Sequence, residues 1–200
     1  MTAKDQQHAG LSPSPWVCSG VEQWLKGRPA GAAGARALDL ACGAGRHAVW
    51  LAQRGFVVHA VDRQQPVVPL AHPNIQFELM DLELDHWPLQ GQQYDVVVVT
   101  NYLHRPHFPA LLDNLAPQGG LLVYETFMDG NAEFGSPRRP EFLLAANELL
   151  ELSKGLHVLK FEQGLRTQPS PAMIQRGLFI SGAWSEIQSG TKTLFHEGTK

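Results

Sequence analysis

The sequence has few cysteines, no excess of positive charge and no long apolar run, and each shortage excludes a class of protein. Cys18 and Cys42 are its two cysteines, too few for a disulfide framework, so we expect reduced thiols in a cytoplasmic protein. Sixteen Lys and Arg stand against nineteen Asp and Glu, and the resulting formal charge of −3 does not fit a general nucleic-acid surface. The start, MTAKDQQHAG, lacks the apolar core of a secretory signal, and no apolar run approaches membrane-spanning length.

The length and the hydrophobic content are those of a globular chain. The 200 residues are 44% hydrophobic and 18% charged, which is enough apolar material for one substantial core and too little charge for a disordered chain. We therefore expect a single domain over residues 1–200. The polar segments 1–13 and 185–200 are predicted to be loose tails.

Apolar runs alternate with helical patterns along the first two thirds of the chain. The four valines at 96–99 are typical of a strand that is buried on both faces. The expected strands are 37–41, 56–61, 75–80, 95–100 and 121–127, and the expected helices between them are 45–54 and about 108–115. This alternation predicts an α/β fold with a doubly wound, mostly parallel sheet.

Both ends of the chain depart from this alternation. Ser14 and Pro15 are typical of a helix start, with Ser14 as the N-cap, and they predict a helix that Gly27 ends. After a polar excursion at 128–140, we expect a helix at 142–152 and two strands at 156–162 and 173–181. Since no helical pattern separates these last two strands, they should pair antiparallel and complete a Rossmann-like sheet of seven strands.

Residues 37–48 read ALDLACGAGRHA, a short strand that turns through Gly43 and Gly45 into a helix. Glycines at such a turn let the backbone approach a ligand, and the helix start offers unpaired N–H groups. The next strand ends in Asp62, nineteen residues after Gly43, where a carboxylate is placed to accept hydrogen bonds from a ribose. Together these features predict a site for a nucleoside-containing cofactor.

The segment GAGRHA also fits the G-x-G-x-x-A fingerprint of dinucleotide-binding folds, so NAD(P) is the competing cofactor. Asp39 opposes that choice because its carboxylate would lie near the pyrophosphate, whereas it suits an ammonium group. Asp81 closes the third strand and offers an acceptor for an adenine amine. The antiparallel hairpin also stands where a dinucleotide fold would continue with parallel strands.

At these residues, and over about 35–181, the chain resembles the class I S-adenosylmethionine-dependent methyltransferases, in particular the branch that includes the tellurite-resistance methyltransferases. The resemblance implies that segment 39–45 wraps the methionine end of S-adenosylmethionine, that Asp62 holds the ribose and that Asp81 and Leu82 border the adenine. Arg46, a cation at a helix start, is a candidate partner of the methionine carboxylate, with solvated surface as the alternative. The residues expected to bind the cofactor are Asp39, Ala41, Gly43, Gly45, Arg46, Asp62, Arg63, Asp81, Leu82, Thr100, Asn101 and Tyr102.

Candidates for catalysis and for substrate binding follow the fourth and fifth strands, at the edge where open parallel sheets bind ligands. If the acceptor needs a base, the candidates are Tyr102, His104 and Glu125. The candidate substrate-binding residues are Arg105, Tyr124, Thr126 and Arg138. For Glu125 the alternative is a structural cap, and for Arg138 it is solvated charge in the 128–140 excursion. No metal site is expected, because no Cys or carboxylate ligand set with zinc spacing accompanies His104 and His107.

The sequence thus predicts methyl transfer from S-adenosylmethionine to an acceptor by in-line displacement. A small-molecule acceptor is favoured, because Asn101-Tyr102-Leu103-His104 lacks the prolines that amine-modifying members of the family often carry there, and because no basic domain is appended. Protein and RNA acceptors stay open. Two other classes also stay open, namely an NAD(P)-dependent oxidoreductase and a catalytically idle protein that binds S-adenosylmethionine.

Overall fold

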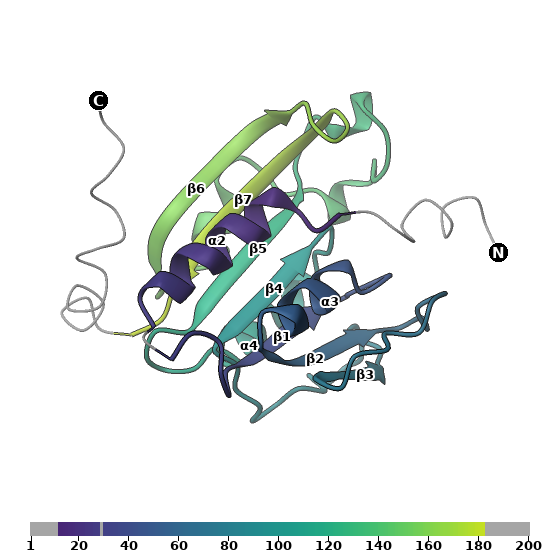
Figure 1. The fold of residues 1–200 in the computed structure, drawn as a ribbon. Coiled ribbons are helices and arrows are strands. Elements are labelled where there is room, and N and C mark those ends of the chain that lie inside the picture. Colours follow the sequence, from purple (N-terminus) through teal and green to yellow (C-terminus); the bar gives the residue numbers. More distant parts are fainter. Residues whose placement is uncertain (1–11, 29, 183–200) are drawn as a thin grey trace.

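The computed structural model describes residues 12–28 and 30–182, and it contains one sheet of seven strands (Figure 1). The strands are β1 (Arg36–Leu40), β2 (Val57–Asp62), β3 (Ile75–Leu79), β4 (Val96–Thr100), β5 (Leu121–Phe127), β6 (His157–Arg166) and β7 (Ala172–Ile180). The helices are α2 (Pro15–Lys26), α3 (Arg46–Gln53), α4 (Phe108–Leu112) and α5 (Glu148–Leu152), with short 3₁₀ turns η1 (Arg105–His107), η2 (Asn131–Glu133) and η3 (Pro140–Phe142). None of these helices is long and apolar enough to cross a membrane.

The strand order is β3-β2-β1-β4-β5-β7-β6. The first five strands are parallel, while β7 pairs antiparallel with both β5 and β6. From β1 the chain first builds outward to β2 and β3, then returns to add β4 on the other side. At such a reversal the loops that follow the strands diverge, and they leave a crevice at the carboxyl ends of β1 and β4.

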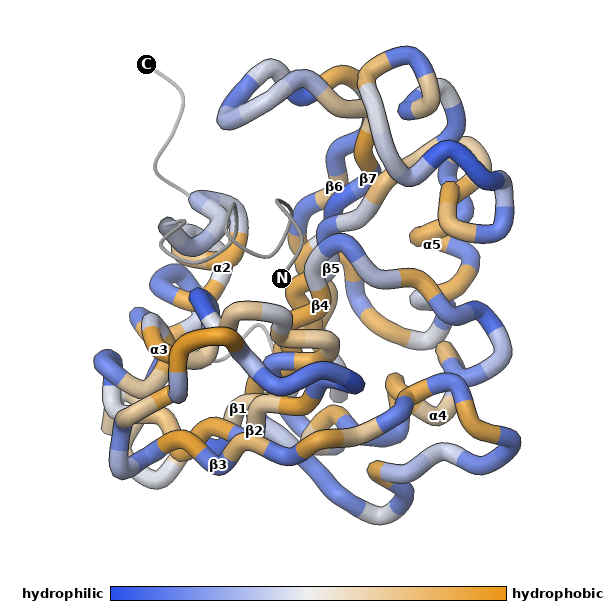
Figure 2. Tube along the Cα trace, turned by 90° about the vertical axis from the view of Figure 1, so that its right-hand side faces the viewer, coloured by the Kyte–Doolittle hydropathy of each residue, from blue (hydrophilic) through white to orange (hydrophobic). Residues whose placement is uncertain are grey.

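The strands alternate their side chains between two apolar cores, one on each face of the sheet. Val96 and Val98 of β4 pack with α2 and α3, whereas Val97 and Val99 pack with α4 and α5. Figure 1 shows α2 and α3 side by side on the near face, and Figure 2 shows hydrophobic colouring concentrated on the central strands. A strand that is covered on both faces reads as a continuous apolar run, which explains the four consecutive valines.

Most elements expected from the sequence are confirmed. The five parallel strands lie within one residue of their predicted bounds, and the final hairpin is antiparallel as predicted, although β6 continues to Arg166. Ser14 precedes α2, but its side chain makes no capping hydrogen bond; its hydroxyl donates instead to Glu125 at 3.5 Å. The predicted tails lie outside the described residues, apart from Ser12 and Pro13.

The predicted helix at 142–152 is wrong for its first half. Helix α5 begins only at Glu148, after Asn147 with a left-handed φ of 63°. Leu143 and Leu144 are buried in extended backbone, where Leu144 forms a bridge with Met128. Their burial beside the end of β5 satisfies the apolar pattern that a helix would otherwise explain. Helix α4 is also shorter than expected and ends at Leu112.

Candidate functional site

Two cavities open at the carboxyl ends of the parallel strands, where the strand order reverses. The first has a volume of about 1050 Å³ and lies between the glycine turn, α3 and the β2–β3 loop. The second has a volume of about 750 Å³ and lies over the ends of β3, β4 and β5. Ala41, Asp62 and Asn101 line both cavities, so the two spaces meet at the ends of β1, β2 and β4.

The turn after β1 depends on its glycines in two different ways. Gly43 has a left-handed φ of 56° and lines the first cavity, where a Cβ atom would meet no protein atom within 4 Å. Gly45 has a φ of 71°, and a Cβ atom there would lie 2.4 Å from the Leu70 side chain. The first glycine therefore leaves room for a ligand, while the second lets the β2–β3 loop close over the turn.

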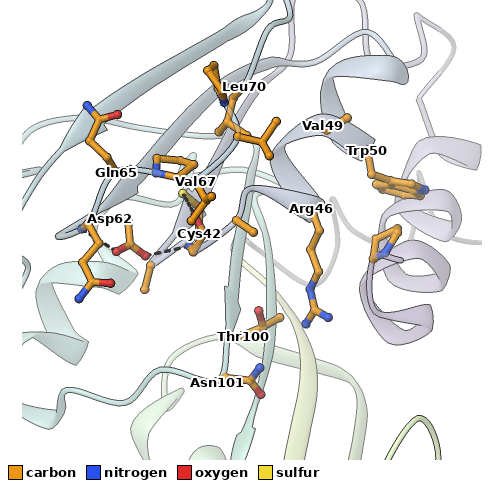
Figure 3. A pocket seen from close by; sticks show the side chains of 18 of the residues that line it. Cys42, Arg46, Val49, Trp50, Asp62, Gln65, Val67, Leu70, Thr100 and Asn101 are labelled. Carbon is orange, nitrogen blue, oxygen red and sulfur yellow. Dashed lines mark hydrogen bonds between the residues drawn. The ribbon is translucent and has the colours of Figure 1, made fainter. Parts of the chain in front are cut away.

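Asp62 lies where the two cavities join and is tied to the turn. Its carboxylate accepts hydrogen bonds from the Gly43 N–H at 2.8 Å and from the Gln64 N–H at 2.9 Å (Figure 3). A carboxylate offers about four acceptor positions, so acceptor capacity remains for a ligand. The end of β2 thus presents a half-buried anion that the backbone holds in place.

The second cavity contains the residues expected around an adenine. Arg63, Asp81, Leu82 and Tyr102 line it together, and the Asp81 carboxylate accepts a hydrogen bond from the Glu83 N–H at 2.9 Å. The Tyr102 hydroxyl is buried and has no hydrogen-bond partner among the described residues. Burial raises the pKa of this phenol, and the Glu83 and Asp81 carboxylates raise it further. Tyr102 therefore keeps its proton, and no described residue uses its O–H donor.

Arg46 is the cation of the first cavity. Its side chain extends from the first turn of α3 toward Thr100 at the end of β4 (Figure 3). Its guanidinium makes no hydrogen bond or ion pair with the described residues. Burial lowers the pKa of Arg46, while the carboxylates of Asp39 and Glu125 raise it. A half-buried guanidinium without a bonded partner favours an anionic group at this end of the cavity.

Asp39 lies behind the turn and does not line either cavity. It is 1% exposed, and its carboxylate accepts a hydrogen bond from the Ala48 N–H at 2.8 Å. Burial raises its pKa to about 7. The neighbouring His47 is equally buried; burial and Arg46 lower its pKa to about 3, so the neutral ring accepts a hydrogen bond from the Ser14 N–H. Asp39 thus supports the start of α3 from within the core, and Gly45 also lies outside the cavity linings.

The thiol of Cys42 faces the first cavity from the middle of the turn. Burial raises the pKa of this thiol, and the carboxylates of Asp39 and Asp62 raise it further. Cys42 is therefore a protonated thiol at neutral pH. No role for this side chain could be predicted from the sequence.

The structure brings few of the candidate catalytic and substrate-binding residues to the cavities. Thr126 and Tyr102 line the second cavity. Tyr124 is 1% exposed, and its hydroxyl donates to the Tyr102 carbonyl at 2.7 Å. Tyr124 therefore stabilises the backbone that follows β4 from within the core. His104 lies outside both linings, with its ring 4.8 Å from that of His107.

The three remaining candidates make contacts of their own. Arg105 donates to Glu148 at 2.5 and 2.9 Å and so ties η1 to α5. Glu125 is 3% exposed and forms ion pairs with Arg166 and Arg176. Arg138 is exposed and donates to the Gly135 carbonyl at 3.3 Å. We infer that these three residues stabilise the structure around the site.

Part of the cavity wall could not be predicted from the sequence. The β2–β3 loop contributes Gln64, Gln65, Pro66, Val67, Val68, Pro69 and Leu70 to the first cavity. From the 128–140 excursion, Ser136 and Pro137 line the second cavity, together with Phe142. The glycine and proline content of these segments indicated surface loops, but no periodicity shows which side chains turn inward. Among the described residues, no group of three or more His, Cys, Asp or Glu could hold a metal ion.

Part of the chain matches a known family of domains. Residues 37–118 match the family model described as a methyltransferase domain. No curated protein sequence matches the chain. Many solved structures share its fold, and the three described below are less than 25% identical to it.

Three of these structures illustrate the likeness. TehB from Haemophilus influenzae is 19% identical with a TM-score of 0.67; the match covers 89% of this chain but only 65% of TehB. The N-methyltransferase NodS from Bradyrhizobium japonicum WM9, in complex with S-adenosyl-L-homocysteine, is 17% identical with a TM-score of 0.61, over 90% and 97% of the two chains. The 1,6-didemethyltoxoflavin-N1-methyltransferase of Burkholderia thailandensis is 16% identical with a TM-score of 0.59, over 84% and 79%.

Proposed function

We propose that the chain transfers a methyl group from S-adenosylmethionine to a small-molecule acceptor, because residues 37–118 match the model of a methyltransferase domain and the chain shares its fold with solved methyltransferases. The observation that carries the proposal is the position of Asp62. Its carboxylate is fixed by the glycine turn at the point where the two cavities meet. If the ribose of S-adenosylmethionine lies at Asp62, the rest of the cofactor extends into both cavities.

The residues around Asp62 fit the separate parts of S-adenosylmethionine. Asp62 would hold the ribose, and Asp81 and Leu82 would border the adenine, with the unused Tyr102 hydroxyl beside them. The open space at Gly43 admits the methionine part, and Arg46 would pair with its carboxylate. Asp39 would act on this part only indirectly, by holding the start of α3.

When bound, S-adenosylmethionine supplies an electrophilic methyl group. The chain's own contribution is to hold the acceptor opposite the sulfur and to exclude water, since positioning lowers the barrier by up to about 7–11 kcal/mol in ideal cases. A nucleophile that is already anionic needs no base. For a neutral alcohol or amine, Tyr102 is the one of our three candidates that lines a cavity, although its raised pKa makes it a weak base.

We propose that the acceptor is a small molecule and that residues 1–200 act as one domain in the cytoplasm. The support for the acceptor is the likeness in fold to a methyltransferase of 1,6-didemethyltoxoflavin. Ser136 and Pro137 of the 128–140 loop line the second cavity together with Asp81.

Two measurements test the proposal. Calorimetry should detect binding of S-adenosylhomocysteine in the micromolar range, while NADH should give no fluorescence enhancement. A labelled-methyl screen against fractionated small molecules, peptides and RNA should then label a small molecule. NADH binding without S-adenosylhomocysteine binding would replace the proposal with an oxidoreductase. Cofactor binding with no labelled product in any fraction would indicate a catalytically idle binding protein.

A further inference from the structure

The second cavity extends beyond the place proposed for the adenine. At one end it is lined by Asp81 and Leu82, which follow β3, and at the other by Thr126 and Phe127 of β5. In the strand order β3-β2-β1-β4-β5 these two strands are four spacings apart, or roughly 19 Å. An adenosine held at Asp62 and Asp81 therefore occupies the β3 end and leaves the β5 end for another molecule.

The wall at the β5 end is apolar and contains two aromatic rings. Phe127 is the last residue of β5, and Pro137 and Phe142 come from the segment that follows it. The Phe142 side chain is 40% exposed. Since water is released when apolar surface is covered, an exposed ring that lines a cavity favours an apolar ligand.

Among the described residues, the charged side chains that line the second cavity all lie at or after the ends of β2 and β3. They are Asp62, Arg63, Asp81 and Glu83, three carboxylates against one guanidinium. No charged side chain of β5 or of the described segment 128–142 lines the cavity. An anionic acceptor would be repelled by the carboxylates and would find no cation at the β5 end, so the lining favours an uncharged molecule.

The arginines closest in sequence to this wall have other contacts. Arg139 forms an ion pair with Glu141, and its guanidinium lies 5.2 Å from the centre of the Phe142 ring. Arg138 donates to the Gly135 carbonyl, and neither arginine lines a cavity. Neither therefore provides a positive charge for a ligand in the second cavity.

We propose that the methyl acceptor is an uncharged aromatic molecule whose ring packs against Phe142 at the β5 end of the second cavity; this rests on the proposed function. Aromatic rings pack against one another in offset or edge-to-face geometry, and such pairs are more favourable than the buried area alone explains. Phe127 and Phe142 provide two rings for this contact. Phe142 is then a specificity-determining residue, because it contacts the acceptor and not the cofactor.

The ring that packs against Phe142 could also be the adenine of the cofactor, and one variant separates the two sources. Phe142→Ala removes the ring without opening the core, since the side chain is partly exposed. If Phe142 binds the acceptor, the Kd of this variant for S-adenosylhomocysteine stays within twofold of wild type. If Phe142 binds the adenine, the variant loses affinity for S-adenosylhomocysteine, and the proposal is overturned.

The direct test measures three probes by calorimetry on full-length protein saturated with S-adenosylhomocysteine. The probes are 2-naphthol, which is uncharged at neutral pH, its saturated match decahydro-2-naphthol and its anionic match 2-naphthoate. Wild type should bind 2-naphthol at least fivefold more tightly than either match, and Phe142→Ala should bind it at least fivefold more weakly than wild type. Equal binding of 2-naphthol by the two proteins, or no preference of wild type over either match, would overturn the proposal.

Two further variants serve as controls. Phe134 lies in the same segment and is 42% exposed but lines neither cavity, so Phe134→Ala should bind 2-naphthol as wild type does. If Phe142→Ala does not fold, Phe142→Leu keeps an apolar side chain without the ring. It should lose the preference for 2-naphthol over decahydro-2-naphthol, and a retained preference would contradict the proposal.

The proposed function can fail separately from this inference. Failure of wild type to bind S-adenosylhomocysteine would refute the proposed function itself. That outcome is seen before any probe is added, so the two failures are distinguishable.

Discussion

At the scale of single residues, Asp62 connects the glycine turn to both cavities through its carboxylate. We expect Asp62→Ala to weaken S-adenosylhomocysteine binding by about 1–3 kcal/mol, the usual effect of removing a charged hydrogen-bond partner. Calorimetry measures the loss. The free energy of unfolding should also fall, because the Gly43 and Gln64 N–H groups lose their acceptor.

Asp113→Ala is a matched control for this variant. Asp113 is an exposed carboxylate next to the end of α4, outside both cavity linings. Its removal should leave the affinity for S-adenosylhomocysteine unchanged. If a folded Asp62→Ala protein binds as tightly as this control, Asp62 does not hold the ribose.

The buried pair of Asp39 and His47 predicts a pH dependence of stability. The pKa of His47 falls from 6.5 to about 3, so its contribution to stability is present above about pH 6.5 and is lost as the pH falls toward 3. The pKa of Asp39 rises from 3.8 to about 7, so its contribution is present below about pH 3.8 and is lost as the pH rises toward 7. Between these limits the two slopes are opposite and nearly cancel.

His47→Gln removes the contribution of His47 to the pH dependence and leaves that of Asp39. The glutamine side chain still offers an acceptor for the Ser14 N–H. The stability of the variant relative to wild type should therefore fall as the pH rises from about 4 to 6.5, by at most about 1.4 kcal/mol per pH unit. Urea unfolding of both proteins across this range measures the difference. Parallel curves for the two proteins would show that His47 does not titrate differently in the folded and unfolded states.

At the scale of elements, the β2–β3 loop is closed over the glycine turn by the contact between Leu70 and Gly45. Gly45→Ala combines a left-handed φ with a clash against Leu70, so we expect the free energy of unfolding to fall by more than the roughly 1–2 kcal/mol that the φ alone costs. Thermal and urea unfolding measure the loss.

Gly119→Ala separates the two causes. Gly119 has nearly the same φ, 72°, but a Cβ atom there meets nothing within 4 Å. Gly119→Ala should lower the free energy of unfolding only by the cost of the left-handed φ. Gly45→Ala/Leu70→Ala should lose nearly the same amount, because the double variant has no clash with Leu70. Equal losses for Gly45→Ala and Gly119→Ala would mean that the loop moves away from the turn without cost.

The elements that the sequence predicted well are those with a strong local signal. Four consecutive valines predict the buried strand β4, and the two glycines after β1 predict the tight turn that follows it. Both signals lie within a few neighbouring residues of the sequence. Residues 142–147 show the opposite case. Their apolar spacing fits a helix, yet Leu144 is buried as extended backbone because it pairs with Met128 at the end of β5. A pairing partner that lies sixteen residues away leaves no trace in the local pattern.

At the scale of the whole molecule, ligand binding and folding are linked, because the two cavities exist only in the folded chain. S-adenosylhomocysteine at 100 times its Kd should raise the free energy of unfolding by about 2.7 kcal/mol, or the melting temperature by about 5–10 °C. Differential scanning calorimetry measures the rise. NAD at the same concentration should give none, and a rise with NAD alone would favour the oxidoreductase.

The places of Asp62, Asp81 and Asn101 beside the cavities could be predicted from the sequence, because each lies at or just after the end of a strand and parallel strands end at one edge of the sheet. The surroundings of Glu125 could not. Its partners Arg166 and Arg176 come from two later strands, and only the antiparallel register brings them to the same face of the sheet. Three charges that are 10 to 51 residues apart in sequence therefore look like unrelated surface residues until the fold is known.

The burial of Cys42 makes the cysteine of the glycine turn a poor nucleophile. An activated methyl group reacts with thiolates far more readily than with thiols, since the thiolate is the nucleophile. Burial raises the pKa of the Cys42 thiol, the carboxylates of Asp39 and Asp62 raise it further, and the sulfur therefore stays protonated. If S-adenosylmethionine binds beside Cys42 as proposed, the protonated thiol protects the protein from methylating its own cysteine.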